Sequence, residues 1–300
     1  GAWEGAWFLQ AGHTVRARTE ARLEVYRSED VTNLTLGDIS RERASFAAAL
    51  FDEWRFLEDQ WSLPGAGRIE TVRQQDQSWV PWSLALGVIW RPLKGLRVKA
   101  PVARTVRIPD FDELFLDTEF VRGDPNLRPE QALATDLGVL FEGWHTPTGV
   151  PRIRAQVVGF AHTIEDMILF LPVSASLSLA TNLRQTTSVG AVTALEVSPW
   201  SPLSLHVAYT FTEARLQTSA RARALPLQPR HRLTGELRWD VGWGRSLEGR
   251  VQGRSEIFLD AFARRSNPAW WTVDALARYE PGSWGFVTGE VRNLADVQGA

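Results

Sequence analysis

The densest group of possible metal ligands is an acidic run between residues 110 and 119. It contains Asp110, Asp112, Glu113, Asp117 and Glu119, and carboxylate oxygens are the ligands that Ca²⁺ and Mg²⁺ prefer. The spacing does not reproduce the Asp-x-Asp-x-Asp-Gly loop of a calcium site. The favoured interpretation is therefore a solvated acidic loop, and we predict no metal site.

Side chains that take part in catalysis are present without the spacing that catalysis needs. The sequence contains no Gly-x-Ser-x-Gly, P-loop or His-Glu-x-x-His motif. Cysteine is absent, which excludes disulfides, Cys-ligated metal sites and a thiol nucleophile. No metal-ligand spacing relates the five histidines, which are His13, His145, His162, His206 and His231. We predict that the chain is not an enzyme and has no catalytic residue and no cofactor.

The composition restricts the partners and the fold class. Lys and Arg number 33 and Asp and Glu number 35, so the net charge of −2 disfavours a surface that binds nucleic acid. A hydrophobic content of 44% and a charged content of 23% indicate a folded chain. The longest apolar run, Met167 to Val173, is far shorter than the ~20 residues of a membrane-spanning helix.

Alternation of polar and apolar residues predicts that strands position these side chains. In residues 203–213 the odd positions from Leu203 to Phe211 are apolar and most even positions are polar, which gives one apolar and one polar face. The Ala-rich segment 44–51 is the best helix candidate, and the even parity of its large apolar residues favours a strand. Similar runs, about fourteen in all, lie at 2–9, 14–25, 43–56, 61–70, 82–90, 96–104, 132–142, 152–162, 187–197, 203–213, 232–241, 247–257, 271–279 and 284–292.

The connections between these runs alternate in length. Short ones lie at 57–60, 91–95, 143–151, 198–202, 242–246 and 280–283, and long ones lie at 27–42, 71–81, 105–131, 163–186, 214–230 and 259–269. In an up-and-down meander, alternate connections emerge at the same end. One end would therefore carry tight turns and the other large loops, as in an outer-membrane barrel with short periplasmic turns and long extracellular loops.

The two strand faces differ in a way that favours a membrane barrel. One face carries dense charges of both signs, and small residues such as Ala17 and Gly235 interrupt the apolar one. We therefore expect Leu237 to face lipid, and His206 and Glu236 to face a wet lumen. A soluble β-sandwich or propeller is the alternative, although no repeat of ~40 residues supports a propeller. A soluble carbohydrate-active enzyme is disfavoured because no catalytic motif is present.

Residues 104–138 contain a long motif of turn and strand-end residues. It resembles the barrel signature of TonB-dependent outer-membrane receptors, in which an Arg-x-Pro-x-(Phe/Asn)-x-Glu-Leu segment precedes Gly-Asn-Pro-x-Leu-x-Pro-Glu. Asp124 stands where the family usually has Asn. The matching residues are Arg107, Pro109, Phe111, Glu113, Leu114, Gly123, Pro125, Asn126, Leu127, Pro129, Glu130 and Gly138.

Shorter stretches extend the resemblance towards the end of the chain. Asn182 weakly fits the family's aromatic-x-Asn strand start, and 229–233 is similar to its Pro-x-His-x-Leu turn. Residues 189–196 resemble its Gly-Val-Glu-x-Glu strand. The family's Val-x-Asn-Leu-Phe-Asp segment is matched by Val291, Asn293, Leu294 and Asp296.

The resemblance implies an all-β fold, an antiparallel up-and-down transmembrane β-barrel. The family has a plug domain with a TonB box, followed by a barrel of about 22 strands. We expect residues 1–300 to be a partial barrel domain with about 14 of those 22 strands, without the plug, the first strands and the final strand.

The resemblance also implies a function in the cell outer membrane. The expected activity is TonB-energised uptake of a scarce solute such as an iron-siderophore or cobalamin. The expected partners are outer-membrane lipid, a small-molecule ligand, and the TonB–ExbB–ExbD complex, which would act through the plug. A passive outer-membrane porin is the alternative, because it needs neither plug nor energy. The sequence does not identify the residues that contact the ligand.

We interpret the motif itself as a structural one, which stabilises the fold and sets the register of the strands. Glu113 and Glu130 are expected to pair with Arg107 or Arg128 and to fix the base of the loop. Most of the 14 Trp lie near strand ends, where rings form girdles at membrane interfaces; stacking on a ligand is the alternative. The girdle set is Trp54, Trp61, Trp82, Trp90, Trp144, Trp200, Trp243, Trp271 and Trp284.

Overall fold

A computed structural model describes residues 2–9, 12–28, 39–75, 77–145, 151–174, 176–200, 202–217, 222–259 and 264–294. Strands dominate these residues, and the helix among them, α1 (Phe111–Phe115), has five residues. In the described ranges no helix has the length and apolar character needed to cross a membrane. The predicted all-β fold is confirmed, with α1 as an addition inside the expected loop 105–131.

Fourteen of the strands have seven residues or more, in agreement with the predicted number. They are β1 (Ala2–Leu9), β2 (His13–Ser28), β3 (Ile39–Phe56), β4 (Trp61–Gln74), β6 (Trp82–Leu93), β7 (Leu96–Arg107), β9 (Glu130–His145), β10 (Pro151–Pro172), β11 (Ser178–Trp200), β12 (Leu203–Gln217), β14 (His231–Gly242), β15 (Arg245–Arg254), β18 (Trp270–Gly282) and β19 (Gly285–Val291). The short strands are β5 (Gln77–Trp79), β8 (Val121–Arg122), β13 (Ala222–Ala224), β16 (Ile257–Phe258) and β17 (Ser266–Asn267).

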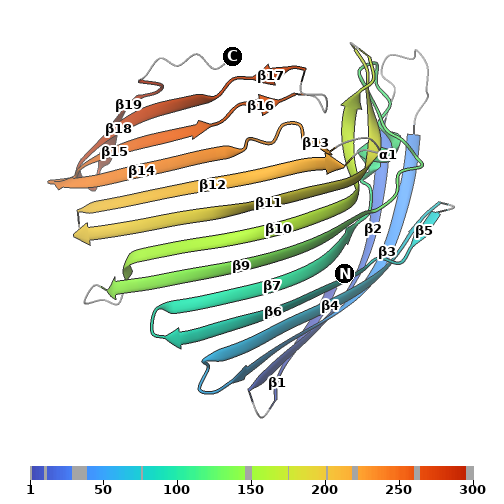
Figure 1. Ribbon diagram of the computed structural model, residues 1–300, viewed down its shortest axis with the longest axis horizontal. Coiled ribbons are helices and arrows are strands. Elements are labelled where there is room, and N and C mark those ends of the chain that lie inside the picture. Colours follow the sequence, from blue (N-terminus) through green and yellow to red (C-terminus); the bar gives the residue numbers. More distant parts are fainter. Residues whose placement is uncertain are drawn as a thin grey trace. The chain divides into compact units, whose positions relative to one another are not determined.

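Successive long strands pair with one another as an up-and-down meander (Figure 1). The long loop predicted at 163–186 is wrong, because β10 continues to Pro172 and β11 begins at Ser178. Strand pairing needs only backbone hydrogen bonds, whereas alternation needs one wet and one apolar face. In the continued part of β10 the run from Met167 to Pro172 is apolar throughout and Ile168 is buried, so this part lacks the alternation on which the prediction depended.

The chain divides into two compact units, which we describe separately. Unit 1 comprises Gly1–Trp90, Pro101–Thr135 and Thr163–Gln185. Its antiparallel register places Ala17, Leu50, Gly67 and Leu84 in one row across β2, β3, β4 and β6. The next row, on the opposite face, contains Arg18, Ala49, Arg68 and Ser83. We call the first side of unit 1 its apolar face and the second its charged face.

Unit 2 comprises Arg91–Ala100, Asp136–His162 and Thr186–Ala300. One row across β12, β14, β15, β18 and β19 contains Leu205, Leu237, Gly249, Ala275 and Val291. The neighbouring row on the other side contains His206, Glu236, Arg250 and Asp274. The predicted separation of apolar from charged side chains is therefore confirmed. We call the side with the first row the apolar face of unit 2 and the side with the second row its charged face.

Tight turns join the strands of unit 2 where the sequence predicts them. The β14–β15 and β18–β19 connections lie at the same end of the meander, together with the β11–β12 turn (Figure 1). At Gly244 the backbone φ is +72°, and a Cβ atom would run into the carbonyl oxygen of Glu280. Glycine is needed there because it alone adopts this conformation without a side chain to accommodate.

Candidate functional site

The recognised motif forms a charged network in unit 1, with Arg107 at its centre. Arg107 ends β7, and its two Nη atoms donate to both carboxylate oxygens of Glu113 on α1 at 2.9 Å. Its Nε donates to Glu130, the first residue of β9, at 2.7 Å. Bidentate arginine–carboxylate pairs of this kind fix geometry as well as adding energy. The expected pairing of both glutamates with Arg107 is confirmed.

The two glutamates extend this network to other segments. The Glu130 carboxylate accepts a hydrogen bond from the backbone N–H of Ile168 in β10 at 2.6 Å. Glu113 accepts one from the backbone N–H of Asp110 at 2.8 Å, at the start of α1. One arginine and two carboxylates thus connect β7, α1, β9 and β10, and all four carboxylate oxygens accept hydrogen bonds.

A small apolar core lies beneath the network. Leu114, Leu127, Ile168 and Ala180 are buried together, and Phe115 packs against them. Leu114 is 1% exposed, so the Glu-Leu pair of the motif supplies one charged partner and one buried anchor. Pro109 is also fully buried. Burial of a leucine side chain stabilises by about 1.5–3 kcal/mol, which makes α1 an anchored element despite its length.

Arg43 fastens the segment before α1 to the neighbouring wall of strands. It is 8% exposed and lies in β3, where its Nε donates to Gln74 of β4 at 2.8 Å. Its Nη2 donates to the carbonyl oxygen of Pro109 at 2.7 Å, and its guanidinium lies 4.4 Å from the centre of the Phe111 ring. The Phe111 ring in turn stacks on Tyr26 at 5.5 Å.

The turn that follows α1 fits closely against that helix. Gly123 donates its N–H to the Leu116 carbonyl at 2.6 Å. A Cβ atom on Gly123 would lie 2.7 Å from the carbonyl oxygen of Glu113, so only glycine allows this approach. Asp124 accepts hydrogen bonds from the N–H and the side-chain amide of Asn126 at 2.9 and 3.1 Å. The Asp124 side chain therefore stabilises this turn through hydrogen bonds to its backbone and to Asn126.

Asn182 is a genuine member of this site, although the sequence only weakly indicated it. Its side chain accepts from the N–H of Arg128 at 2.8 Å and donates to the carbonyls of Arg128 and Asp166 at 3.0 and 2.7 Å. Of the two arginines that the sequence offered as partners of Glu113 and Glu130, Arg107 is the one that binds them. The Nη2 of Arg128 donates instead to the Asp166 carboxylate on β10 at 2.6 Å.

The remaining motif residues fall outside this cluster or outside the described residues. Gln77 donates to the carbonyl of Pro125 at 3.1 Å, which fastens the turn to β5. Pro129 precedes β9 and directs the chain into it. In unit 2, the backbone N–H of Asn293 donates to the Asp274 carboxylate at 2.8 Å, and the N–H of Leu294 donates to the carbonyl of Val273. Asp296 lies outside the described residues.

Among the described residues, no group of three or more His, Asp or Glu side chains lies close enough to bind a metal ion. The acidic run is divided among separate partners: Glu113 binds Arg107, and Asp117 binds Arg122 at 2.9 Å. The hydrogen bonds of this cluster connect the ends of β7 and β9 with α1 and β10.

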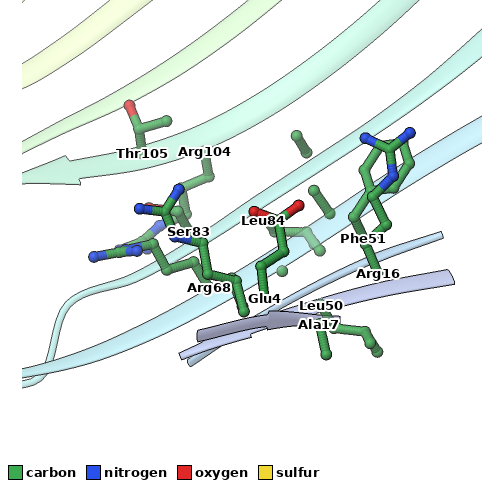
Figure 2. Close-up of a pocket in the computed structure, with 15 residues that line it drawn as sticks. Glu4, Arg16, Ala17, Leu50, Phe51, Arg68, Ser83, Leu84, Arg104 and Thr105 are labelled. Atoms are coloured by element: carbon green, nitrogen blue, oxygen red, sulfur yellow. The ribbon is translucent and has the colours of Figure 1, made fainter. Parts of the chain in front are cut away.

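Residues of both faces of unit 1 line an open hollow of about 310 Å³, among them Arg18 and Arg68 of the charged face and Leu50 and Leu84 of the apolar face. Figure 2 shows Glu4, Arg16 and Arg68 on one side of the sheet, whereas Leu50 points to the other side. Glu20 binds Arg22 at 2.8 Å on the same face, and Arg68 binds Glu70 at 3.0 Å. The charges largely compensate one another, which is the composition expected of a wet wall.

Ion pairs also cross the strands of unit 2 on its charged face. Glu142 of β9 binds Arg97 of β7, and it binds Arg154 of β10 at 3.0 Å. Arg154 also reaches Glu196 of β11 at 3.4 Å. His206 lies opposite Glu236 in the register, on this charged face as predicted.

Tryptophans stand at both ends of the strands, mostly with exposed rings. Trp243 and Trp284 lie in or beside tight turns and are 85% and 83% exposed. In unit 1, Trp61 and Trp90 stack at 5.6 Å near the turn end, and Trp82 lies at the opposite end of β6. This placement agrees with girdles; the side chain of Trp144 lies outside the described residues.

The sequence analysis did not identify the residues that bind the motif residues. Arg43, Gln74, Asp166 and Ile168 lie far from the motif in sequence, on β3, β4 and β10. Arg43 and Gln74 are polar residues in mostly polar stretches of sequence, so their burial is not evident from the sequence alone. Asp166 has a backbone φ of +54°, a conformation that the sequence alone does not predict.

Comparison with known proteins decides the family. A family model described as TonB dependent receptor-like, beta-barrel, matches residues 5–294. The chain belongs to the TonB-dependent receptor β-barrel family. A search of curated protein sequences gives no match.

Solved structures of this family share the fold. The copper transporter OprC superposes with a TM-score of 0.80 at 15% identity, over 100% of this chain and 50% of that one. A mutant of the ferric enterobactin receptor PfeA from Pseudomonas aeruginosa gives 0.75 at 16% identity, over 99% and 48%. The siderophore receptor PirA from Pseudomonas aeruginosa gives 0.74 at 17% identity, over 99% and 51%. The chain thus spans about half the length of these receptors.

Proposed function

We propose that this chain is part of the barrel wall of an outer-membrane receptor that takes up a scarce solute with energy from TonB. The match of residues 5–294 to the TonB-dependent receptor barrel family carries the proposal. The printed names of similar structures include a copper transporter and siderophore receptors, so a metal ion or an iron-siderophore is the favoured class of solute, with cobalamin as a further candidate.

The two faces of each unit support a membrane location. The apolar face leaves Leu233, Leu237, Trp239 and Leu247 between 42% and 46% exposed in unit 2. Such a surface is favourable against lipid and unfavourable in water. The charged face carries compensated ion pairs, which suits a wall that encloses water or a polar plug domain. On this proposal the motif network fixes the base of the solute-binding loops and does not contact the solute.

An uptake experiment on the complete receptor tests this function. Cells that lack the receptor gene, cells that lack TonB and wild-type cells are compared for accumulation of radioactive iron-siderophores, cobalamin and copper. We expect one of these solutes to accumulate in wild-type cells and to be lost in both deletion strains. Uptake that requires the receptor but persists without TonB would favour the passive porin.

A further inference from the structure

Arg104 is a cation on the apolar face of unit 1. Trp82 pairs with Ile69, and two residues further along the strands Leu84 pairs with Gly67 on the apolar face. Residues two apart in a strand share a face, so Trp82 also lies on the apolar face. The Arg104 guanidinium lies 3.7 Å from the centre of the Trp82 ring. Its Nη1 donates to the carbonyl of Trp82 at 2.7 Å, and its Nη2 donates to the side chain of Gln131 at 2.7 Å. The charge is thus held against the ring on the apolar side.

The tryptophans of β6 show the level at which Arg104 lies. Trp82 and Trp90 stand at the two ends of a row in which Leu84, Leu86 and Val88 alternate with inward residues. Eight residues along a strand tilted by ~40° span about 20 Å perpendicular to the membrane. This is close to the height of an apolar band between two aromatic girdles, about 25 Å. Arg104 therefore lies at the edge of the band that is nearer the long loops.

The charge of Arg104 is not neutralised by the described residues. Both of its polar partners, the Trp82 carbonyl and the Gln131 amide, are neutral. These bonds use two of the five N–H groups of a guanidinium, which leaves donors for a further acceptor. Elsewhere in unit 1, Arg18, Arg22 and Arg68 each bind a carboxylate on the charged face.

Arg73 provides a second cation on the same face. Arg73 lies opposite Ala44 in the register, four residues beyond Ile69 along β4. It is exposed and has no ion pair within the described part of the chain. Arg73 is thus farther from the apolar band than Trp82 by about 10 Å, at a level that lipid headgroups occupy.

We propose that Arg104 and Arg73 each bind a phosphate group of the phosphorylated glycolipid that forms the outer leaflet of the outer membrane. Guanidinium groups bind phosphate bidentately, and the apolar row Leu84, Leu86 and Val88 offers a surface for acyl chains below the headgroup. The proposal rests on the outer-membrane location in the proposed function. It adds a lipid site outside the barrel, separate from any solute site within it.

The test uses the complete receptor, purified in detergent, and measures binding of purified lipopolysaccharide. The variants are Arg104→Gln, Arg73→Gln and the double variant. Arg16→Gln is the matched control, because Arg16 also lies against a ring, that of Phe51 at 5.6 Å, but belongs to the charged face. A basic residue near an anionic membrane contributes about 1 kcal/mol, which corresponds to a weakening of about fivefold for each arginine.

We expect the double variant to bind about 25-fold more weakly, and Arg16→Gln to bind as the wild type does. Removal of the lipid phosphates should weaken wild-type binding by a similar factor and leave the double variant unaffected. Unchanged binding by the double variant, or an equal loss in Arg16→Gln, would overturn the site. An equal loss of binding to phosphatidylglycerol vesicles would overturn its assignment to the glycolipid.

Membrane fractionation of the same cells separates this result from the proposed function. A receptor found in the outer membrane that loses no lipid binding in the double variant contradicts the lipid site alone. A receptor absent from the outer membrane contradicts both proposals. Uptake that is independent of TonB contradicts the proposed transport mechanism and leaves the lipid result standing.

Discussion

At the scale of single residues, Arg107 determines whether the motif network holds. Replacing Arg107 by Met keeps the aliphatic stem but leaves two carboxylates, Glu113 and Glu130, without their cation. Because the Arg107 side chain is 41% exposed, solvent screens part of the loss. We expect the free energy of unfolding of the complete receptor to fall by about 1–2 kcal/mol, measured by denaturant titration in detergent.

Arg122→Met is the control for that measurement. Arg122 forms one exposed ion pair with Asp117 in the same loop region. Exposed pairs contribute about 0–1 kcal/mol, so this variant should lose clearly less stability than Arg107→Met. Equal losses would contradict the view that Arg107 is the centre of the network.

Gly123 provides a second test at the residue scale. A Cβ atom there would lie 2.7 Å from the Glu113 carbonyl oxygen and 2.7 Å from the Leu114 carbonyl carbon, both parts of the backbone. Gly123→Ala should therefore cost about 1–3 kcal/mol through overpacking. Gly67→Ala is the control, since nothing lies within 4 Å of its Cβ position. Thermal unfolding of both variants would refute the prediction if the two midpoints matched.

At the scale of elements, the central question is which face of β14 meets lipid. Leu237 lies on the apolar face between Leu205 and Gly249, and Glu236 lies on the charged face between His206 and Arg250. We expect Leu237→Arg to destabilise the complete barrel by about 2–4 kcal/mol, because the charge would enter the lipid band. Refolding of the variant into vesicles measures this loss.

Cysteine labelling examines the same assignment without disturbing the charges. In the complete receptor in its membrane, a cysteine at position 236 should react with a water-soluble reagent. A cysteine at position 237 should be protected, because lipid covers the neighbouring side chains. Labelling of position 237 in preference to position 236 would reverse the assignment of the faces.

At the scale of the whole molecule, we expect residues 1–300 to be unable to form a stable barrel on their own. Strands whose tilt and stagger suit a barrel of about 22 strands do not meet when only about 14 are present. Unpaired backbone groups in lipid cost several kcal/mol each. Expressed alone, the chain should aggregate, whereas the complete receptor should migrate as a heat-resistant folded monomer in detergent.

Recovery of residues 1–300 as a heat-resistant monomer would contradict this expectation. Disulfide trapping then shows how such a monomer closes, with one cysteine placed in β1 and one in β19. Cross-linking between those strands would mean that the strand number suits a smaller barrel. Aggregation of the complete receptor under identical conditions would show that the refolding conditions, and not the missing strands, are responsible.

The sequence by itself determined the strand faces, the tight turns and the motif. Alternation depends only on which side each successive residue points to, so Leu237 and Glu236 are assigned to opposite faces without knowledge of their neighbours. Turn residues such as Gly244 are equally local, because backbone conformation selects them. The pairing of Arg107 with Glu113 was predictable because the two lie six residues apart.

Only the tertiary structure decided which residues form hydrogen bonds with the motif. Arg43 and Pro109 are 66 residues apart, and Asn182 and Arg128 are 54 apart. Whether such residues meet depends on the stagger of every strand between them, and one residue of slip moves a side chain to the other face. Many arginines and carboxylates fit the same chemistry: the sequence left Arg107 and Arg128 open as partners of the two glutamates, and in the fold Arg128 binds Asp166. The hydrogen-bonded register of the sheet therefore selects the partners, and that register is a property of the folded whole.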